Sequence, residues 1–432
     1  MNSPSVKKND IGIEAFNRLG DEIDGLWLEK NYNEDDLPSI AADALKRADL
    51  PSKLSAWDVV DWSLSAHNLP PQRDLHGRFG DPPITIYSGP RFHIDLYFWF
   101  EGTTAIHQHG FCGAFQVLLG SSIHSWYEFD RKEKVNTFFE IGDIRLKVCE
   151  ILEVGDVQEI WGGRRYIHSL FHLDRPSATI VVRTDRSPID LPQFSYEKPY
   201  IAVDPFFEQA ATIKKVQMMG TLLRAQRPDA DEAIARLLRA SDLQTSFAIL
   251  SSLRGALRSD QLKQMFSPEA SGTRFDALLD VAIEQHGTKA AVLKQVFEHY
   301  EMLDEIVKRR SYVSDPEHRF FMALLLNVDR RTPIFDLVRH RFPDADPVEK
   351  ILDWVFDLAE TRVVGIESSN ALGIADFGET EMFVLEALLR DKSDDEIQQE
   401  FSSEPRQGVG RPIDDAIDAV RQAVIFRPLM KV

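Results

Sequence analysis

The chain has 432 residues, of which 43 % are hydrophobic and 28 % are charged, a composition that predicts a folded protein of more than one domain. Acidic residues outnumber basic residues by 69 to 50, and the net charge of −19 argues against nucleic acid and anionic membranes as partners. With two cysteines, no signal-like segment and no apolar run of roughly 18 residues, we expect a cytoplasmic protein that spans no membrane.

The first part of the chain carries helical patterns. Residues 11–32 place apolar side chains at helical spacing, and shorter patterns follow at about 35–48 and 55–66, the last behind Ser55 as a candidate N-cap. Prolines and glycines then interrupt the periodicity. We therefore predict an N-terminal helical cap over residues 1–82.

The next part changes to short runs rich in Ile, Val, Phe, Tyr and Trp. Residues 91–100 alternate between two faces, as in a half-buried strand, and no helical pattern separates this run from its successors. Such a series predicts an antiparallel β-barrel or sandwich. We assign it to residues 83–190.

Beyond Pro205 the pattern is helical almost to the end of the chain. Residues 288–312 form the longest periodic stretch, and Ser314 with Glu317 and Ser393 with Glu396 have the spacing of capping boxes. We predict a helical domain over residues 206–375 and a small helical unit over residues 376–432. The fold class is thus α+β multidomain, with a β-barrel preceded by short helices and followed by an all-α region.

Two histidines stand out within the predicted barrel. His107 and His109 are separated by one residue, so both side chains lie on the same face of a strand. The next positions on this face are Phe111 and Gly113, and Gly113 has no side chain that could bind a metal. His168 could supply a third imidazole from a distant strand. These ligands suit Fe(II), Ni(II), Cu(II) or Zn(II) better than an ion that prefers oxygen. The alternative is that the histidines are buried, hydrogen-bonded strand residues.

The spacing of these residues resembles the two cupin motifs. His107, His109, Gly113 and Gly120 follow the first motif, except that Gly113 stands at the place of the glutamate. Gly155, His168 and His172 resemble the second motif, with His172 at the place of the asparagine. The resemblance covers about residues 80–190 and implies a double-stranded β-helix barrel with a metal in its mouth.

Loss of the glutamate is characteristic of the thiol dioxygenases among cupins, and residues 92–120 are similar to cysteine dioxygenase. This resemblance implies Fe(II) held by His107, His109 and His168, although Ni, Zn and Mn bind imidazoles as well. The tyrosine of that family near the end of the last barrel strand has no counterpart at residues 181–185. The resemblance therefore implies iron but not cysteine as the substrate.

Further candidates surround the predicted metal site. Arg183 and Arg164 could pair with a substrate carboxylate, although surface positions are commoner for arginine. Tyr97, Gln116 and Tyr166 could supply hydrogen bonds, Tyr166 in a catalytic role. His172 could be an acid/base group, a fourth ligand or a structural residue. The remaining histidines of the region, His93 and His124, are expected to be core or barrel-surface residues.

These observations favour a non-haem, iron-dependent dioxygenase of the thiol dioxygenase type, acting with dioxygen on a small anionic or thiol-containing substrate. The alternative is a non-enzymatic cupin that senses a ligand or metal and whose helical domain contacts a protein partner. A metal-free structural barrel is a third possibility. The helical region offers no catalytic motif, and its apolar stripes could form a core, a homo-oligomer interface or a contact with another protein.

Overall fold

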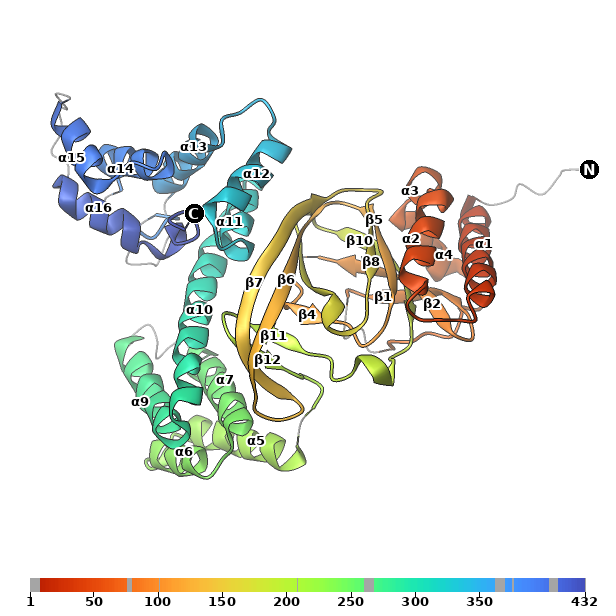
Figure 1. The fold of residues 1–432 in the computed structure, drawn as a ribbon, viewed down its shortest axis with the longest axis horizontal. Coiled ribbons are helices and arrows are strands. Elements are labelled where there is room, and N and C mark those ends of the chain that lie inside the picture. Colours follow the sequence, from red (N-terminus) through yellow and green to blue (C-terminus); the bar gives the residue numbers. More distant parts are fainter. Residues whose placement is uncertain are drawn as a thin grey trace, which may run out of the picture. The chain divides into compact units, whose positions relative to one another are not determined.

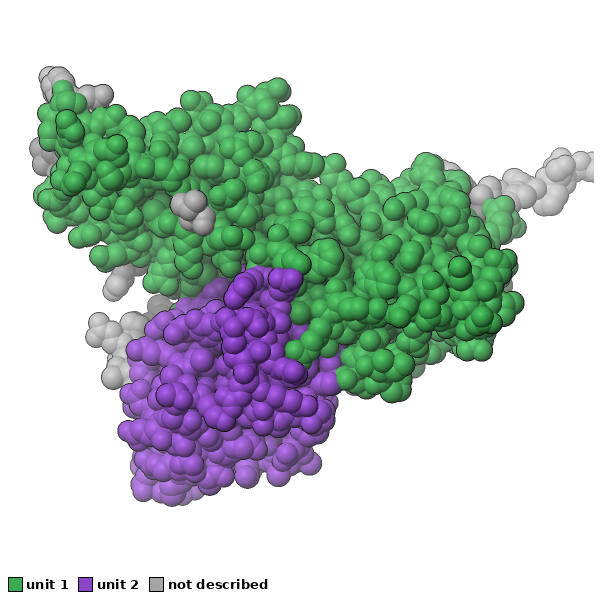
Figure 2. All heavy atoms as spheres, viewed as in Figure 1, with its two compact units in different colours: residues 1–127, 146–191, 301–432 green, residues 128–145, 192–300 purple. Residues whose placement is uncertain are grey.

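The computed structural model describes residues 8–75, 80–100, 102–207, 209–259, 268–361, 370–374, 377–403 and 411–431. The chain divides into two compact units (Figure 2). Unit 1 comprises residues 1–127, 146–191 and 301–432, and unit 2 comprises residues 128–145 and 192–300. The predicted domain limits stay predictions, and the one between residues 375 and 376 lies outside the described residues.

The order of the elements confirms the predicted fold class: helices come first, then a β-barrel, then helices to the end (Figure 1). The N-terminal helices are α1 (Lys8–Glu29), α2 (Leu37–Ala48), α3 (Leu50–Lys53) and α4 (Ala56–Ser65). Ser55 caps α4 in a capping box with Asp58, as its position before the helical pattern predicts. Apolar side chains of these helices, such as Phe16 and Leu45, share one core with the first barrel sheet.

That sheet has five strands, in the spatial order β1-β2-β10-β5-β8, and all its pairings are antiparallel. Its strands are β1 (Pro83–Ser88), β2 (Phe92–Trp99), β10 (Ser177–Thr184), β5 (Gly113–Leu119) and β8 (Val157–Ile160). Along β2, Phe92, Ile94, Leu96 and Phe98 belong to the core shared with the helices. The intervening side chains therefore face the opposite side, which is the barrel interior.

The second sheet is centred on β9, which pairs antiparallel with β3 and β4 along one edge and with β6 along the other. Its strands in this part are β3 (Gly102–Thr103), β4 (His107–Gln108), β6 (Ser122–Lys134), β7 (Phe139–Leu152) and β9 (Ile167–His172). Short 3-10 turns, η1 (Gly163–Arg165) and η2 (Pro188–Asp190), follow β8 and β10. The interior is filled by apolar side chains that include Phe111, Phe115 and Leu170.

Unit 2 contains the second half of β6 and the first half of β7 together with helices. Its other elements are β11 (Ser195–Glu197), β12 (Ile201–Val203), α5 (Ala210–Arg224), α6 (Ala230–Arg239), α7 (Leu243–Ser259), α9 (Pro268–His286) and the first part of α10 (Thr288–Arg310). Strand β12 pairs with the start of β7, where Ile201 lies opposite Ile141. Both side chains join the helices in one core.

The C-terminal helices belong to unit 1. They are α11 (Pro316–Asn327), α12 (Arg331–Arg341), α13 (Pro347–Glu360), α14 (Glu379–Leu389), α15 (Asp394–Ser403) and α16 (Ile413–Gln422), before the turn η3 (Val424–Phe426). Ser393 and Glu396 form the predicted capping box of α15. The prediction for α11 is off by one residue, because the Asp315 carboxylate, rather than Ser314, accepts the first backbone N–H groups. Among the described residues, no helix has the length and apolarity needed to cross a bilayer.

Candidate metal centre

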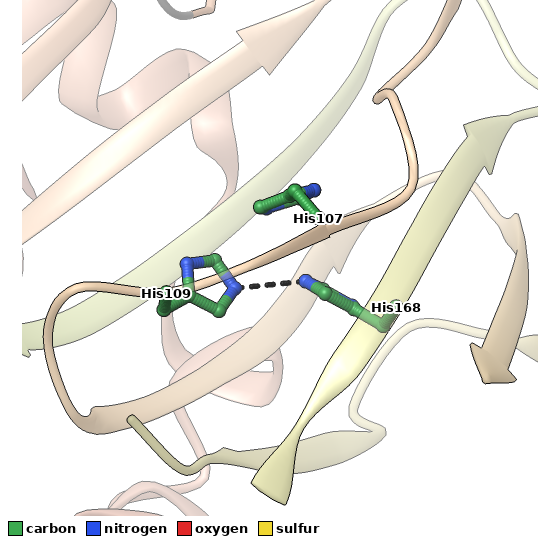
Figure 3. Close-up of side chains that lie close together, drawn as sticks. All are labelled: His107, His109 and His168. Atoms are coloured by element: carbon green, nitrogen blue, oxygen red, sulfur yellow. Dashed lines mark hydrogen bonds between the residues drawn. The ribbon is translucent and has the colours of Figure 1, made fainter. Parts of the chain in front are cut away.

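Three histidines meet inside the barrel, two of them on paired strands (Figure 3). His107 lies on β4 directly opposite His168 on β9, and His109 follows two residues after His107. One ring nitrogen of each histidine lies within 4.8 Å of the other two. His109 Nε2 and His168 Nε2 are hydrogen-bonded to each other at 2.8 Å. The structure thus brings together the three residues that the sequence proposes as metal ligands.

Hydrogen bonding fixes which nitrogen of His107 is available. Its Nδ1 lies 2.7 Å from the backbone oxygen of Ala105, and since a carbonyl oxygen only accepts, Nδ1 carries the proton. The lone pair of His107 is therefore on Nε2. The backbone of His109 also forms an isolated β-bridge with Gly162. A Cβ added at Gly162 would lie 1.9 Å from the Asp190 carboxylate, so the close packing there depends on glycine.

The environment keeps the three imidazoles neutral. His109 and His168 are only 6 % and 3 % exposed, and His107 is half-buried. Burial lowers the pKa of all three side chains, and the pKa values of His109 and His168 fall further because of the neighbouring imidazoles. Neutral imidazole is the form that binds a metal.

The donor set fits a divalent transition-metal ion. Two nitrogens bound to one ion at about 2.0 to 2.1 Å lie roughly 3 Å apart, close to the separation of the two Nε2 atoms of His109 and His168. His168 Nδ1 is buried and has no hydrogen-bond partner among the described residues. The other ring nitrogen, Nε2, is the one that lies against the His109 imidazole. The set suits Fe(II), Ni, Zn or Mn and does not choose among them.

Gly113 explains why no glutamate completes the set. A Cβ added at this position would lie 1.9 Å from the backbone oxygen of Val182 on the paired strand β10. No side chain fits without separating the two strands. The three-histidine composition is therefore built into the backbone of the barrel.

A small cavity of about 40 Å³ adjoins the histidines. At about 10 to 15 Å³ for each water molecule, the cavity has room for roughly three waters. Besides the three histidines, it is lined mainly by apolar and aromatic side chains: Trp99, Phe111, Phe115, Ile160, Leu170 and Val181. Thr104 and Thr179 also contribute to its wall.

Two of the predicted substrate-binding residues, Arg183 and Tyr97, line this cavity. The guanidinium carbon of Arg183 lies 3.5 Å from the centre of the Phe111 ring, so the cation is held against an aromatic face. The other two residues lie elsewhere. Gln116 follows Phe115 on β5 and so faces the opposite side of the sheet, where it donates to the Gly155 carbonyl, and Arg164 is exposed on η1. Neither Gln116 nor Arg164 lines the cavity beside the three histidines.

Tyr166 packs against the candidate ligands, but its hydroxyl is engaged elsewhere. Its ring centre lies 4.4 Å from that of His168, and its hydroxyl lies 2.9 Å from His124 Nε2. His124 Nδ1 in turn lies 2.9 Å from a Glu150 carboxylate oxygen, which only accepts, so Nδ1 donates to Glu150. Sequence analysis gave His124 no role beside the site, since this contact depends on the pairing of β6 with β9.

His172 does not line the cavity. Its ring stacks on Trp99 with centres 4.6 Å apart, and its Nδ1 is hydrogen-bonded to Ser177 Oγ at 2.8 Å. Burial lowers the pKa of His172 to about 3. The position fits the structural alternative for this residue better than the acid/base role.

His172 is expected to make stability depend on pH. Its pKa is about 3 in the folded chain and about 6.5 when unfolded, so between these values the unfolded chain binds more protons. The stabilisation is complete above about pH 6.5 and is lost as the pH falls towards 3, by at most ~1.4 kcal/mol per pH unit. Urea unfolding of the His172→Asn variant should show a shallower loss of free energy below pH 6.5 than the parent. Parallel curves would show that His172 does not titrate in this way.

Comparisons with known proteins leave the function open. No protein-family model matches the chain, and no curated protein sequence is similar to it. Two similar solved structures are a crystal structure of CapF with the inhibitor 3-isopropenyl-tropolone and one of the capsular polysaccharide assembling protein CapF from Staphylococcus aureus. Each is 17 % identical over 34 % of this chain, with TM-scores of 0.18 and 0.17. The match spans little more than a third of those chains, 38 % and 37 %, so the likeness carries no argument about function.

The fold and the site themselves define the class. Two sheets close around His107 and His168, which lie on paired strands, and around His109, so the domain is a β-barrel with a candidate metal centre.

Proposed function

We propose that this protein is an Fe(II)-dependent dioxygenase of the thiol dioxygenase type, acting with dioxygen on a small anionic or thiol-containing substrate. The observation that carries the proposal is the convergence of His107, His109 and His168 beside Arg183, with no carboxylate among the three ligands. Three neutral ligands leave the full +2 charge on the metal, which favours an anionic ligand such as a thiolate.

The residues of the chain would bind and orient the substrate. A bound Fe(II) would supply the exchange of electrons with dioxygen that the protein alone cannot perform. Arg183 would attract and hold an anionic group of the substrate, because its guanidinium lines an otherwise mainly apolar cavity. The aromatic and aliphatic wall would exclude water from the reacting groups.

The test is dioxygen consumption by the Fe(II)-loaded chain with a panel of small thiols, some of which carry a carboxylate. We expect turnover with at least one carboxylate-bearing thiol. Arg183→Gln should raise KM for that thiol by about tenfold or more, since a charge-assisted hydrogen bond is worth ~1.5 to 3 kcal/mol, while bound iron stays the same. Arg183→Lys, which keeps the charge but not the planar geometry, is the matched control. Its KM should lie between those of the parent and of Arg183→Gln.

Full iron occupancy without dioxygen consumption for any thiol would contradict the dioxygenase proposal. Ligand binding without turnover, together with a ligand-dependent change in association with a protein partner, would instead support the sensor alternative. Loss of iron in Arg183→Gln would show that this residue supports the metal centre and not the substrate.

A further inference from the structure

A buried carboxylate organises the polar end of the cavity wall. Asp95, on the interior face of β2, is 3 % exposed. Thr85 Oγ1 lies 2.7 Å from Asp95 Oδ1, while Tyr97 Oη and His93 Nε2 lie 3.0 and 3.2 Å from Asp95 Oδ2. Thr85 is the direct partner of Asp95 across the β1–β2 pairing, and His93 and Tyr97 are two residues away on the same face of β2. The role of Asp95 depends on the pairing of β1 with β2, which no motif in the sequence signals.

The ionisation of Asp95 fixes the direction of these hydrogen bonds. Burial acts to raise the pKa of Asp95, but hydrogen bonds from His93, Thr85 and Tyr97 outweigh it, so the pKa is lowered and the group is a carboxylate. A carboxylate only accepts, so Tyr97 donates its single hydroxyl proton to Asp95. Turning that proton towards the cavity would leave a buried anion one donor short, which is costly.

The same hydroxyl oxygen lies beside Arg183. Burial and Asp95 raise the pKa of Tyr97, and the charge of Arg183 and its hydrogen bond to the hydroxyl act in the opposite direction. Arginine only donates, so the Tyr97 oxygen is an acceptor on this side. Tyr97 and Arg183 both line the cavity next to the three histidines. Tyr97 and Arg183 therefore stand side by side in the cavity wall, with the Tyr97 hydroxyl bonded to both Asp95 and Arg183.

We propose that Asp95 is a positioning residue that fixes Tyr97 as a hydrogen-bond acceptor beside Arg183, so that the cavity selects small acids with a hydrogen-bond donor next to the carboxylate. This inference rests on the proposed function, because it takes the cavity to be the substrate site. The carboxylate would pair with Arg183, and the neighbouring hydroxyl or amine of the ligand would donate to Tyr97. Asp95 itself would touch no ligand.

Three simple acids test the inference in the full chain without metal. Glycolate has a hydroxyl donor next to its carboxylate, methoxyacetate replaces that donor with an ether oxygen, and acetate is smaller and has neither. We expect calorimetry to show glycolate binding about fivefold more tightly than either of the others, the ratio typical of one net hydrogen bond. Including acetate separates the lack of a donor from the larger size of methoxyacetate.

Variants then assign the preference to the proposed residues. Tyr97→Phe should abolish the preference for glycolate. Asp95→Asn should also abolish it, because the new amide can donate to Tyr97 and release the hydroxyl proton, while acetate binding should change less than twofold. If the role of Asp95 were merely structural, Asp95→Asn would instead weaken the binding of all three acids alike. Asp204→Asn, the same change at a buried aspartate outside this network, is the matched control and should keep the preference.

Any of three results would overturn the inference. The parent chain binds the three acids equally, it binds none of them, or the preference survives both Tyr97→Phe and Asp95→Asn. Because the chain carries no iron in this measurement, such a result would not bear on the metal ligands or on turnover. Conversely, a failed thiol screen would leave the acid preference standing.

Discussion

His109→Ala and His168→Ala are each expected to prevent the chain from binding Fe(II). Both side chains are buried, and their Nε2 atoms lie 2.8 Å apart, so either substitution takes one of three ligands from the centre. Affinity should fall by more than about 100-fold, since loss of a residue that only supports a ligand already costs 10- to 100-fold. Elemental analysis of the purified, Fe(II)-loaded chains measures this directly, and His107→Ala belongs in the same series.

The fold should survive these substitutions. Truncating a buried side chain costs ~1 to 3 kcal/mol, which a chain with several separate cores is expected to tolerate. Fe(II) should raise the melting temperature of the parent and not that of the variants, because a ligand of the folded state stabilises it in proportion to its binding. His340→Ala, at an exposed position on α12, is the control and should keep the parent's metal content. A variant that retains full metal occupancy would exclude its residue from the site.

Gly113→Ala is expected to destabilise the barrel strongly. The new Cβ would lie 1.9 Å from the Val182 carbonyl oxygen, a backbone atom of the central strand β10. Relief requires the pairing of Gly113 with Arg183 to open, so the free energy of unfolding should fall by ~3 kcal/mol, at the upper end of the usual cost of overpacking. The midpoint of urea unfolding provides the measurement.

Gly25→Ala is the matched control. It lies within α1, and an added Cβ at this position meets no atom within 4 Å. It should stabilise the chain by ~0.5 to 1 kcal/mol, the usual gain of alanine over glycine in a helix. Gly113→Glu, which would place the glutamate of the first cupin motif at this position, should be at least as destabilising as Gly113→Ala. An unfolding midpoint of Gly113→Ala equal to that of the parent would contradict this account of the three-histidine set.

Local patterns in the sequence predicted the elements that depend on near neighbours. The alternation of residues 91–100 corresponds to β2, and the helical period of residues 288–312 corresponds to α10. The pairing of His107 with His109 on one face could also be predicted, because the side-chain period of a strand is fixed by its backbone. The start of α11 was missed by one residue because a serine and an aspartate stand next to each other, and both are good N-caps.

The sequence by itself determined the class of the barrel, the order of the elements and the three candidate ligands. Only the tertiary structure decided which residues stand around them. The register of β4 against β9 places His168 opposite His107, and the faces of β5 and β2 turn Gln116 away from the cavity and Tyr97 towards it. The contacts of Asp95 with Thr85 and of His124 with Tyr166 likewise join residues on different strands. Such contacts depend on pairing between segments far apart in the chain, which no local periodicity encodes.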